Sequence, residues 1–228
     1  IFIQHSLCSM TMIYPSNSFD FFDAIQAVTN YQYKELDEIK KKNNLNFKVF
    51  KSNYLFLKNK VNQFKEKSKK NVLIAPTWNT NFYDLNIHLE ISKILIQKNI
   101  SFDIRPHPMS LKKNEVSLIN LNKLNLSTNL STNLNFFDYD LVISDWSGIF
   151  IEFAVLGKKV LLVDTKKKIL NKNYKNYDNV PAEILFREKM STCFSVNNIK
   201  ELIDEVKKVV NEKRNVNPIN IDKYYFEM

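Results

Sequence analysis

The chain has 228 residues and a formal net charge of +9, with 44% hydrophobic and 13% aromatic residues. This composition fits one large or two small folded domains and excludes a disordered chain. The excess positive charge comes almost entirely from lysine and favours anionic partners, such as phosphorylated ligands or an acidic lipid surface. Because no RNA- or DNA-binding signature and no basic patch interleaved with aromatic residues is visible, we expect no nucleic-acid partner.

Cysteine usage and hydropathy indicate the compartment. Cys8 and Cys193 form neither a metal-binding spacing nor a disulfide framework, which indicates a reducing environment. No apolar run is long enough to cross a bilayer and no signal peptide is visible, so we expect a cytoplasmic location. The lysine-rich character adds the expectation of a peripheral position on the inner face of the cell membrane. The chain starts in strand-like sequence without an initiator Met, which indicates the carboxyl-terminal part of a longer protein.

Residues 1–68 are predicted to form part of a Rossmann-like domain. Short apolar runs predict three strands, and amphipathic spacing predicts two helices before a lysine-rich connector at 65–70. The strands are expected at Ile1–Gln4, Ala24–Val28 and Phe47–Phe50, and the helices at Asn30–Lys42 and Tyr54–Phe64.

His5 follows the first expected strand, beside a polar loop that runs through Ser18. An imidazole at a strand end next to such a loop is well placed to act as a general base. The alternative is a histidine that only hydrogen-bonds the loop. His88 falls in the middle of a predicted helix and is expected to be structural.

Residues 69–210 are predicted to form a second Rossmann-like domain, followed by a tail at 211–228. Strands alternate with helices here, which predicts a parallel, doubly wound α/β sheet whose ligands bind beyond the carboxyl ends of the strands. Strands are expected at Val72–Ala75, Phe102–Arg105, Leu118–Leu121, Leu141–Ser144 and Val160–Val163, and helices at Leu85–Gln97, Ile149–Leu156 and from Ser195 to about Val210.

Two loops are expected at that edge of the sheet. Thr77 lies in the loop Pro76–Asn81, and the run Arg105-Pro-His-Pro108 follows the next strand. Two prolines stiffen this second turn, and both the Arg105 guanidinium and the His107 imidazole can donate hydrogen bonds to phosphate oxygens. The pattern therefore favours an anionic ligand.

A third polar turn, Asp145–Gly148, joins a buried strand to a helix. Ser147 is expected to cap this helix, and Gly148 to let a ligand approach the backbone at the positive end of the helix dipole. Glu152, one turn later, would face a hydroxyl group of the same ligand. An ordinary strand–helix–strand crossover with a capping serine and a solvated glutamate is the alternative. The long polar loop Lys166–Asn179 is typical of a binding loop.

Taken together and in order, these motifs resemble those of the CDP-glycerol glycerophosphotransferases that build teichoic-acid and capsule polymers. The resemblance rests on Gln4–Ser6, Ala75–Trp78, Arg105–Pro108, Ser144–Ala154 and Leu156–Lys158. It implies a GT-B-like fold, with the donor nucleotide bound by the second domain and the acceptor by the partial first domain. This chain has Asp145-Trp-Ser-Gly148 where the family usually has Asp-Tyr-Ser-Ser, and Gln4-His-Ser-Leu7 where the family commonly has Trp-His-Gly-Thr, so the donor is open to variation.

The resemblance also implies roles for single residues. His5 would take the proton of an acceptor hydroxyl, and Glu152 would bind the ribose. The remaining positions that it implies for catalysis or for the donor phosphates are His107, Arg105, Ser147, Gly148, Asp145 and Thr77. It implies no cofactor besides the donor, CDP-glycerol or a related CDP-polyol, and no metal cluster is visible in the sequence.

Three functions are thus open from the sequence. The first is transfer of a polyol phosphate to a polymer or lipid-linked acceptor with release of CMP. The second keeps the fold but uses a nucleotide sugar, as in sugar transferases or UDP-N-acetylglucosamine 2-epimerases. The third is a non-catalytic basic module that docks on acidic surfaces such as the membrane.

Overall fold

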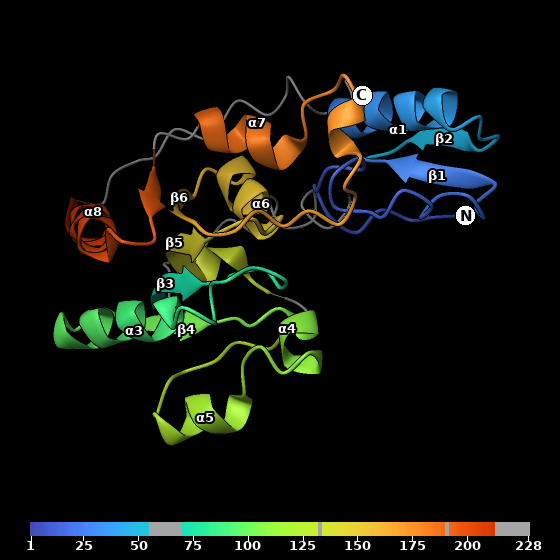
Figure 1. Cartoon of the computed structure of the whole chain (residues 1–228). Coiled ribbons are helices and arrows are strands. Elements are labelled where there is room, and N and C mark those ends of the chain that lie inside the picture. The colour runs from blue at the N-terminus through green and yellow to red at the C-terminus, as the bar shows by residue number, and fades with distance from the viewer. Residues whose placement is uncertain (55–69, 132–133, 190–191, 213–228) are drawn as a thin grey trace.

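The computed structural model describes residues 1–54, 70–131, 134–189 and 192–212 (Figure 1). The predicted helix Tyr54–Phe64, the connector at 65–70 and the tail at 211–228 lie almost wholly outside the described residues, and the domain boundary expected there stays a prediction.

The first part of the chain holds a small parallel sheet of β1 (Ala24–Ala27) and β2 (Lys48–Lys51), joined by helix α1 (Asn30–Lys42). Thr29 caps α1 by accepting a hydrogen bond from the Gln32 amide. These elements match the predicted ones closely. The strand expected at Ile1–Gln4 is reduced to one parallel bridge between Phe2 and Ile25, so this prediction is only partly met.

A five-stranded sheet forms the larger part, in the order β4-β3-β5-β6-β7, with every neighbouring pair parallel. Within this sheet the chain runs from β3 outward to β4 and then crosses back to β5 on the other side of β3, so the winding direction reverses between β3 and β5. The strands are β3 (Lys70–Ile74), β4 (Phe102–Ile104), β5 (Tyr139–Ser144), β6 (Lys159–Asp164) and β7 (Cys193–Ser195).

Both faces of this sheet are buried. Val72 and Ile74 of β3 pack into the cluster formed with α3 (Ile87–Gln97) and α8 (Ile199–Glu212). Leu73 belongs to the cluster on the opposite face. That face is covered by α6 (Ile149–Val155) and α7 (Ala182–Lys189), which Figure 1 shows on the other side of the sheet from α3. Burial of both faces explains why the strands read as nearly continuous apolar runs. The predicted α/β class with a doubly wound parallel sheet is confirmed.

The strand predicted at Leu118–Leu121 is wrong. These residues begin helix α5 (Leu118–Lys123), after the short helix α4 (Pro108–Lys112). The edge position beside β4 is taken by the next segment, in which Thr128 pairs with Ile104 and the Ile104 amide donates to the Ser127 carbonyl. A four-residue stretch with three apolar side chains fits either a strand or a helix turn, so the sequence pattern alone does not decide between them.

Turns in this chain use asparagine where other proteins use glycine. Only two glycines are present. Gly157, with φ of 70°, follows α6 in the left-handed conformation that is typical of the residue after a helix. All six non-glycine residues with positive φ in the described part of the chain are asparagines: Asn44, Asn79, Asn86, Asn99, Asn114 and Asn125. Asparagine tolerates this region better than other side chains with a Cβ, so tight turns form without glycine.

The loop Lys166–Asn179 joins the two parts of the molecule. The amides of Leu170 and Asn171 donate to the Met12 carbonyl at 3.0 and 3.2 Å, and the Asn171 side chain donates to the Thr11 carbonyl. Glu38 of α1 accepts from the amides of Asp178 and Asn179. Two 3-10 turns complete the described elements, at Phe136–Asp138 and Tyr174–Asn176. Within the described residues, no helix combines the length and hydrophobicity needed to span a membrane.

Candidate functional site: a cavity at the reversal point of the sheet

A cavity of about 530 Å³ lies beyond the carboxyl ends of β3, β4 and β5, where the winding direction reverses. This is the position at which doubly wound sheets bind their ligands, and the volume suits a small organic molecule. The wall opposite the sheet comes from the segment around His5–Pro15. The residues that line the cavity are His5, Ser6, Cys8, Ile13, Tyr14, Pro15, Ala75, Pro76, Thr77, Trp78, Arg105, Pro106, His107, Pro108, Met109, Ser147, Gly148, Ile149, Glu152, Lys168 and Leu170.

Arg105 and His107 follow β4 and are both half-buried in the wall. Arg105 donates from Nη1 to the carbonyls of Asn129 and Ser131, at 3.1 and 2.8 Å, which fixes one edge of the guanidinium. His107 caps α4, and its Nδ1 accepts from the Met109 amide at 3.0 Å. Burial, reinforced by Lys168 and Arg105, lowers the pKa of His107 to about 4. At neutral pH the ring is therefore uncharged with its proton on Nε2, where it is a hydrogen-bond donor.

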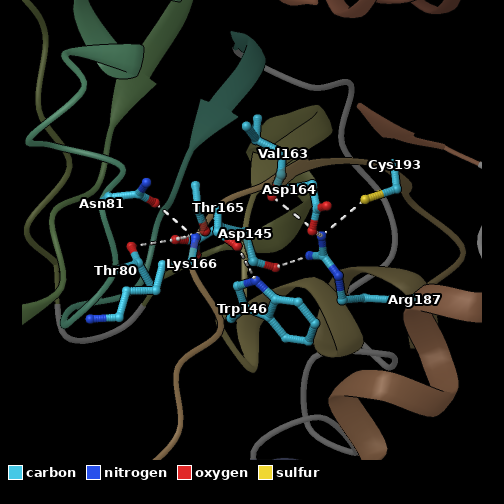
Figure 2. A network of polar contacts seen from close by, with 10 residues as sticks. All are labelled: Thr80, Asn81, Asp145, Trp146, Val163, Asp164, Thr165, Lys166, Arg187 and Cys193. Atoms are coloured by element: carbon cyan, nitrogen blue, oxygen red, sulfur yellow. Dashed lines mark hydrogen bonds and ion pairs between the residues drawn. The ribbon is translucent and has the colours of Figure 1, made fainter. Parts of the chain in front are cut away.

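Asp145 is fully buried and does not line the cavity. Its Oδ1 accepts from the Thr77 amide at 2.8 Å. Its Oδ2 accepts from the Thr80 hydroxyl at 2.9 Å and the Thr165 hydroxyl at 3.4 Å, and Figure 2 shows these three side chains together. Burial raises the pKa of Asp145 to about 6, although these hydrogen bonds act in the opposite direction. The carboxylate therefore joins the loops after β3, β5 and β6.

Arg187 contacts the turn Asp145–Gly148 and was not predicted as a site residue from the sequence. Its Nη1 donates to the Asp145 carbonyl at 2.8 Å, and its guanidinium lies 4.0 Å from the centre of the Trp146 ring (Figure 2). Trp146 in turn donates from Nε1 to the Thr165 carbonyl at 3.0 Å. Arg187 comes from α7, a helix that the sequence signalled only weakly through Pro181 and the spacing of apolar residues after it.

Ser147 and Gly148 do line the cavity, but their local roles differ from the expected ones. Helix α6 begins at Ile149 with Gly148 in the capping position and no side-chain cap, so the prediction that Ser147 caps the helix is wrong. The Ser147 hydroxyl has no hydrogen-bond partner among the described residues and is available to a ligand. A Cβ at Gly148 would lie 2.4 Å from Cys8 Sγ. The close approach that requires glycine here is thus to the chain's own first segment.

Glu152 links the sheet side of the cavity to the wall that carries His5. Its Oε1 accepts from the Tyr54 hydroxyl at 3.0 Å, and that hydroxyl also lies 2.7 Å from the His5 carbonyl. Burial raises the pKa of Glu152 to about 7, while Tyr54 and Arg105 act to lower it. The His5 amide donates to Gln4 Oε1 at 2.9 Å, so the backbone of His5 is fixed on both sides while its ring stays exposed at the cavity wall.

Thr77 and Lys168 complete the lining next to His107. The Thr77 hydroxyl accepts from Lys168 Nζ at 3.0 Å, and the same ammonium lies 4.9 Å from the centre of the Trp78 ring. Burial lowers the pKa of Lys168. Lys168 was not predicted as a site residue, although its loop was. In the sequence it is one of three consecutive lysines, and only the fold places this one inside.

The structure therefore brings together seven of the eight residues singled out from the sequence, with Asp145 directly behind them. His88, expected to be structural, lies on α3 packed against Tyr83 and away from the cavity. Among the described residues, no group of three or more His, Cys, Asp or Glu side chains is placed to hold a metal ion.

Residues 32–219 match the family model of CDP-glycerol:poly(glycerophosphate) glycerophosphotransferases, which covers most of the chain. The chain belongs to this family. The glycerophosphotransferase resemblance found in the motifs is thereby confirmed, and the two parallel α/β parts agree with the GT-B-like fold that it implies. No curated protein sequence matches the chain at a significant level.

Solved structures give a weaker likeness. The structure of the wall teichoic acid polymerase TagF is similar to this chain at 14% identity and a TM-score of 0.44, and the match covers 87% of this chain and 54% of TagF. Another is the Escherichia coli ADP-heptose lipopolysaccharide heptosyltransferase II, at 9% identity and a TM-score of 0.38, covering 75% of this chain and 56% of that one. The chain thus spans about half the length of the solved structures that it matches.

Proposed function

We propose that this chain carries the donor site of a transferase that moves a polyol phosphate from a CDP-linked donor to a hydroxyl of a cell-surface polymer or its lipid-linked precursor. The observation that carries the proposal is the cavity itself. It brings His5, the pair Arg105 and His107, and Ser147 together from three separate segments, so that a possible base faces several hydrogen-bond donors across one cavity. The family model supports a donor of the CDP-glycerol type.

The proposed reaction is a displacement at the phosphorus that carries the polyol. His5 Nδ1 or Nε2 accepts the proton of the acceptor hydroxyl, whose oxygen forms a new bond to that phosphorus. The bond between the phosphorus and the bridging oxygen breaks, and its electron pair leaves with CMP. The exposed ring of His5 on a fixed backbone suits a base that must meet an incoming acceptor.

Negative charge moves onto the bridging oxygen during this step, and fixed donors stabilise it most when no rearrangement is needed. Arg105 is held by two carbonyls, and His107 is held neutral with Nε2–H as a donor. The Ser147 hydroxyl and the Gly148 amide would add uncharged donors, and Thr77 would shape the adjoining wall. Asp145 fits a role in holding Thr77, rather than in contacting the phosphates.

We assign ribose binding to Glu152, because carboxylate oxygens accept hydrogen bonds from vicinal hydroxyls. Its hydrogen bond with Tyr54 places the carboxylate between the donor site and the His5 segment. We further propose that the excess of lysine holds the protein at the acidic inner face of the cell membrane. There it would meet the acceptor polymer on its lipid carrier.

The test is CMP release from CDP-glycerol in the presence of a glycerol-phosphate polymer, measured for the protein and its His5→Ala variant. We expect turnover to fall at least about 100-fold, the effect of losing a general base, while CDP-glycerol affinity stays within about twofold. Lys166→Met, which removes an exposed charge from the neighbouring loop, serves as the control and should turn over normally. Unchanged turnover in His5→Ala would remove the base assignment, and activity with UDP-N-acetylglucosamine instead would replace the donor class.

A further inference from the structure

Lys168 is a buried cation in the cavity wall, and the reaction proposed above gives it no role. Its side chain is 6% exposed, although lysine is among the residue types least often buried. Its Nζ donates to the Thr77 hydroxyl at 3.0 Å and lies 4.9 Å from the centre of the Trp78 ring. Three consecutive lysines occur at this point, and Lys166 and Lys167 are both exposed.

The ammonium of Lys168 is only partly satisfied. It has three N–H donors, and among the described residues the Thr77 hydroxyl is the acceptor for one of them. No carboxylate in the described part of the chain forms an ion pair with it. A buried charge without an ionic partner is costly unless a ligand supplies one.

The carboxylates whose charges act on Lys168 are hydrogen-bonded to other groups. Glu183 accepts from the Ser9 amide at 3.1 Å, and Glu115 accepts from the Asn79 amide at 3.0 Å. Asp145 accepts from the Thr77 amide and the Thr80 hydroxyl. Burial is the largest effect on the pKa of Lys168 and lowers it, whereas Cys8 and these three carboxyl groups act to raise it. The unmet partner of Lys168 is therefore not a side chain of the described residues.

The other groups on this side of the cavity are donors as well. Arg105 and the Nε2–H of His107 line it together with Lys168, and both cations act on the charge of His107. A ligand that fits must bring several acceptor oxygens and at least one negative charge, which describes a phosphate or pyrophosphate group. Lysine binds phosphate as a point charge, and Arg105 can bind it through two nitrogens.

We propose that Lys168 is a phosphate-binding residue of this site, with Thr77 and Trp78 as the positioning residues that aim its ammonium into the cavity. This deepens the proposed function, because the ligand it predicts is the pyrophosphate linkage of the nucleotide donor. Lys168 and Arg105 supply two positive charges, which match the two negative charges of a pyrophosphate diester. On breaking of that linkage, Lys168 offsets the charge that gathers on the departing phosphate.

The test measures binding of inorganic pyrophosphate and of CDP-glycerol by calorimetry to the wild-type chain and three variants. Lys168→Met removes the charge and nearly keeps the volume, whereas Lys168→Gln removes the charge but keeps an N–H donor for Thr77. Lys166→Met is the matched control, since it removes one exposed lysine two residues earlier. Thermal unfolding of each variant is recorded, and Lys168→Gln carries the test if Lys168→Met does not fold.

We expect both Lys168 variants to bind pyrophosphate about 10- to 100-fold more weakly than the wild type, the effect of losing a charge-assisted hydrogen bond, while Lys166→Met stays within about twofold. An equal affinity of wild type and Lys168 variants, or no pyrophosphate binding by the wild type, would overturn the proposal. If pyrophosphate binding depends on Lys168 but CDP-glycerol does not bind, the phosphate-binding role holds and the proposed donor is wrong. If both bind and depend on Lys168, both proposals are supported.

Discussion

Replacement of Gly148 by alanine tests how closely the first segment of the chain packs on the turn that forms the site. The added Cβ would lie 2.4 Å from Cys8 Sγ, against about 3.5–4.0 Å for an ordinary contact between non-bonded carbon atoms. Cys8 is buried in a cluster with Met12, Ile13 and Trp146, so the thiol has little room to move. Overpacking of this kind costs about 1–3 kcal/mol of unfolding free energy.

A double variant separates this clash from any other effect of the alanine. With Cys8→Ala the sulfur is gone, and the nearest Cys8 atoms to the new Cβ are the amide nitrogen at 3.9 Å and Cβ at 4.0 Å, both ordinary contacts. Urea unfolding should show Gly148→Ala/Cys8→Ala to be less destabilised than the sum of the single variants, by about 1–2 kcal/mol. Additive single effects, or a fully stable Gly148→Ala, would refute the packing argument.

Three further predictions concern the buried carboxylates. Burial raises the pKa of Glu152 to about 7, and its ionised form is the better acceptor for ribose hydroxyls. CDP-glycerol affinity, measured by calorimetry at several pH values, should therefore rise as pH increases through 7. Glu152→Gln should lose this dependence on pH. Glu35, buried against Ser9 and close to Glu183, has a pKa raised from 4.5 to about 8. Between pH 4.5 and 8 the folded protein therefore binds a proton at Glu35 that the unfolded chain does not, and the contribution of Glu35 to stability falls as pH rises through this range. The unfolding free energy, measured by urea at several pH values, should fall less steeply with pH in Glu35→Gln than in the wild type. An unchanged dependence on pH would contradict this. Asp145→Ala should lose about 1–3 kcal/mol of unfolding free energy, because it leaves the Thr77 amide unpaired. Asp145→Asn should lose much less, because its amide oxygen can still accept from Thr77, and equal losses in urea unfolding would contradict this role of Asp145.

The sheet and the place of the site could be predicted because both depend on local patterns. Burial on both faces makes β3, β5 and β6 continuous apolar runs, and each ends in a polar turn at the same edge. Helix α1 was predicted to the residue because its amphipathic spacing lies in one short stretch. A helix formed where a strand was predicted at Leu118–Leu121 because three apolar residues in a four-residue stretch do not specify a period.

The rest could not be predicted because it depends on contacts between distant segments. Nothing near Lys168 in the sequence separates it from Lys166 and Lys167, and its burial follows from the path of its loop across the cavity. Asp145 lies in a turn whose sequence is typical of ligand binding, but its carboxylate accepts hydrogen bonds from Thr77 and Thr165, in the loops after β3 and β6. The clash partner of Gly148 lies 140 residues earlier in the chain, at Cys8.

We expect the cavity to bind the cytidine nucleotide of a CDP-linked donor. This is tested most directly by calorimetric titration of the chain with CDP-glycerol, CMP and UDP-N-acetylglucosamine, beside the variant Arg105→Ala/Ser147→Ala. We predict micromolar binding that is confined to the cytidine nucleotides and lost in the variant. Preference for the uridine nucleotide, or binding of CDP-glycerol that the variant retains, would contradict the assignment of this site.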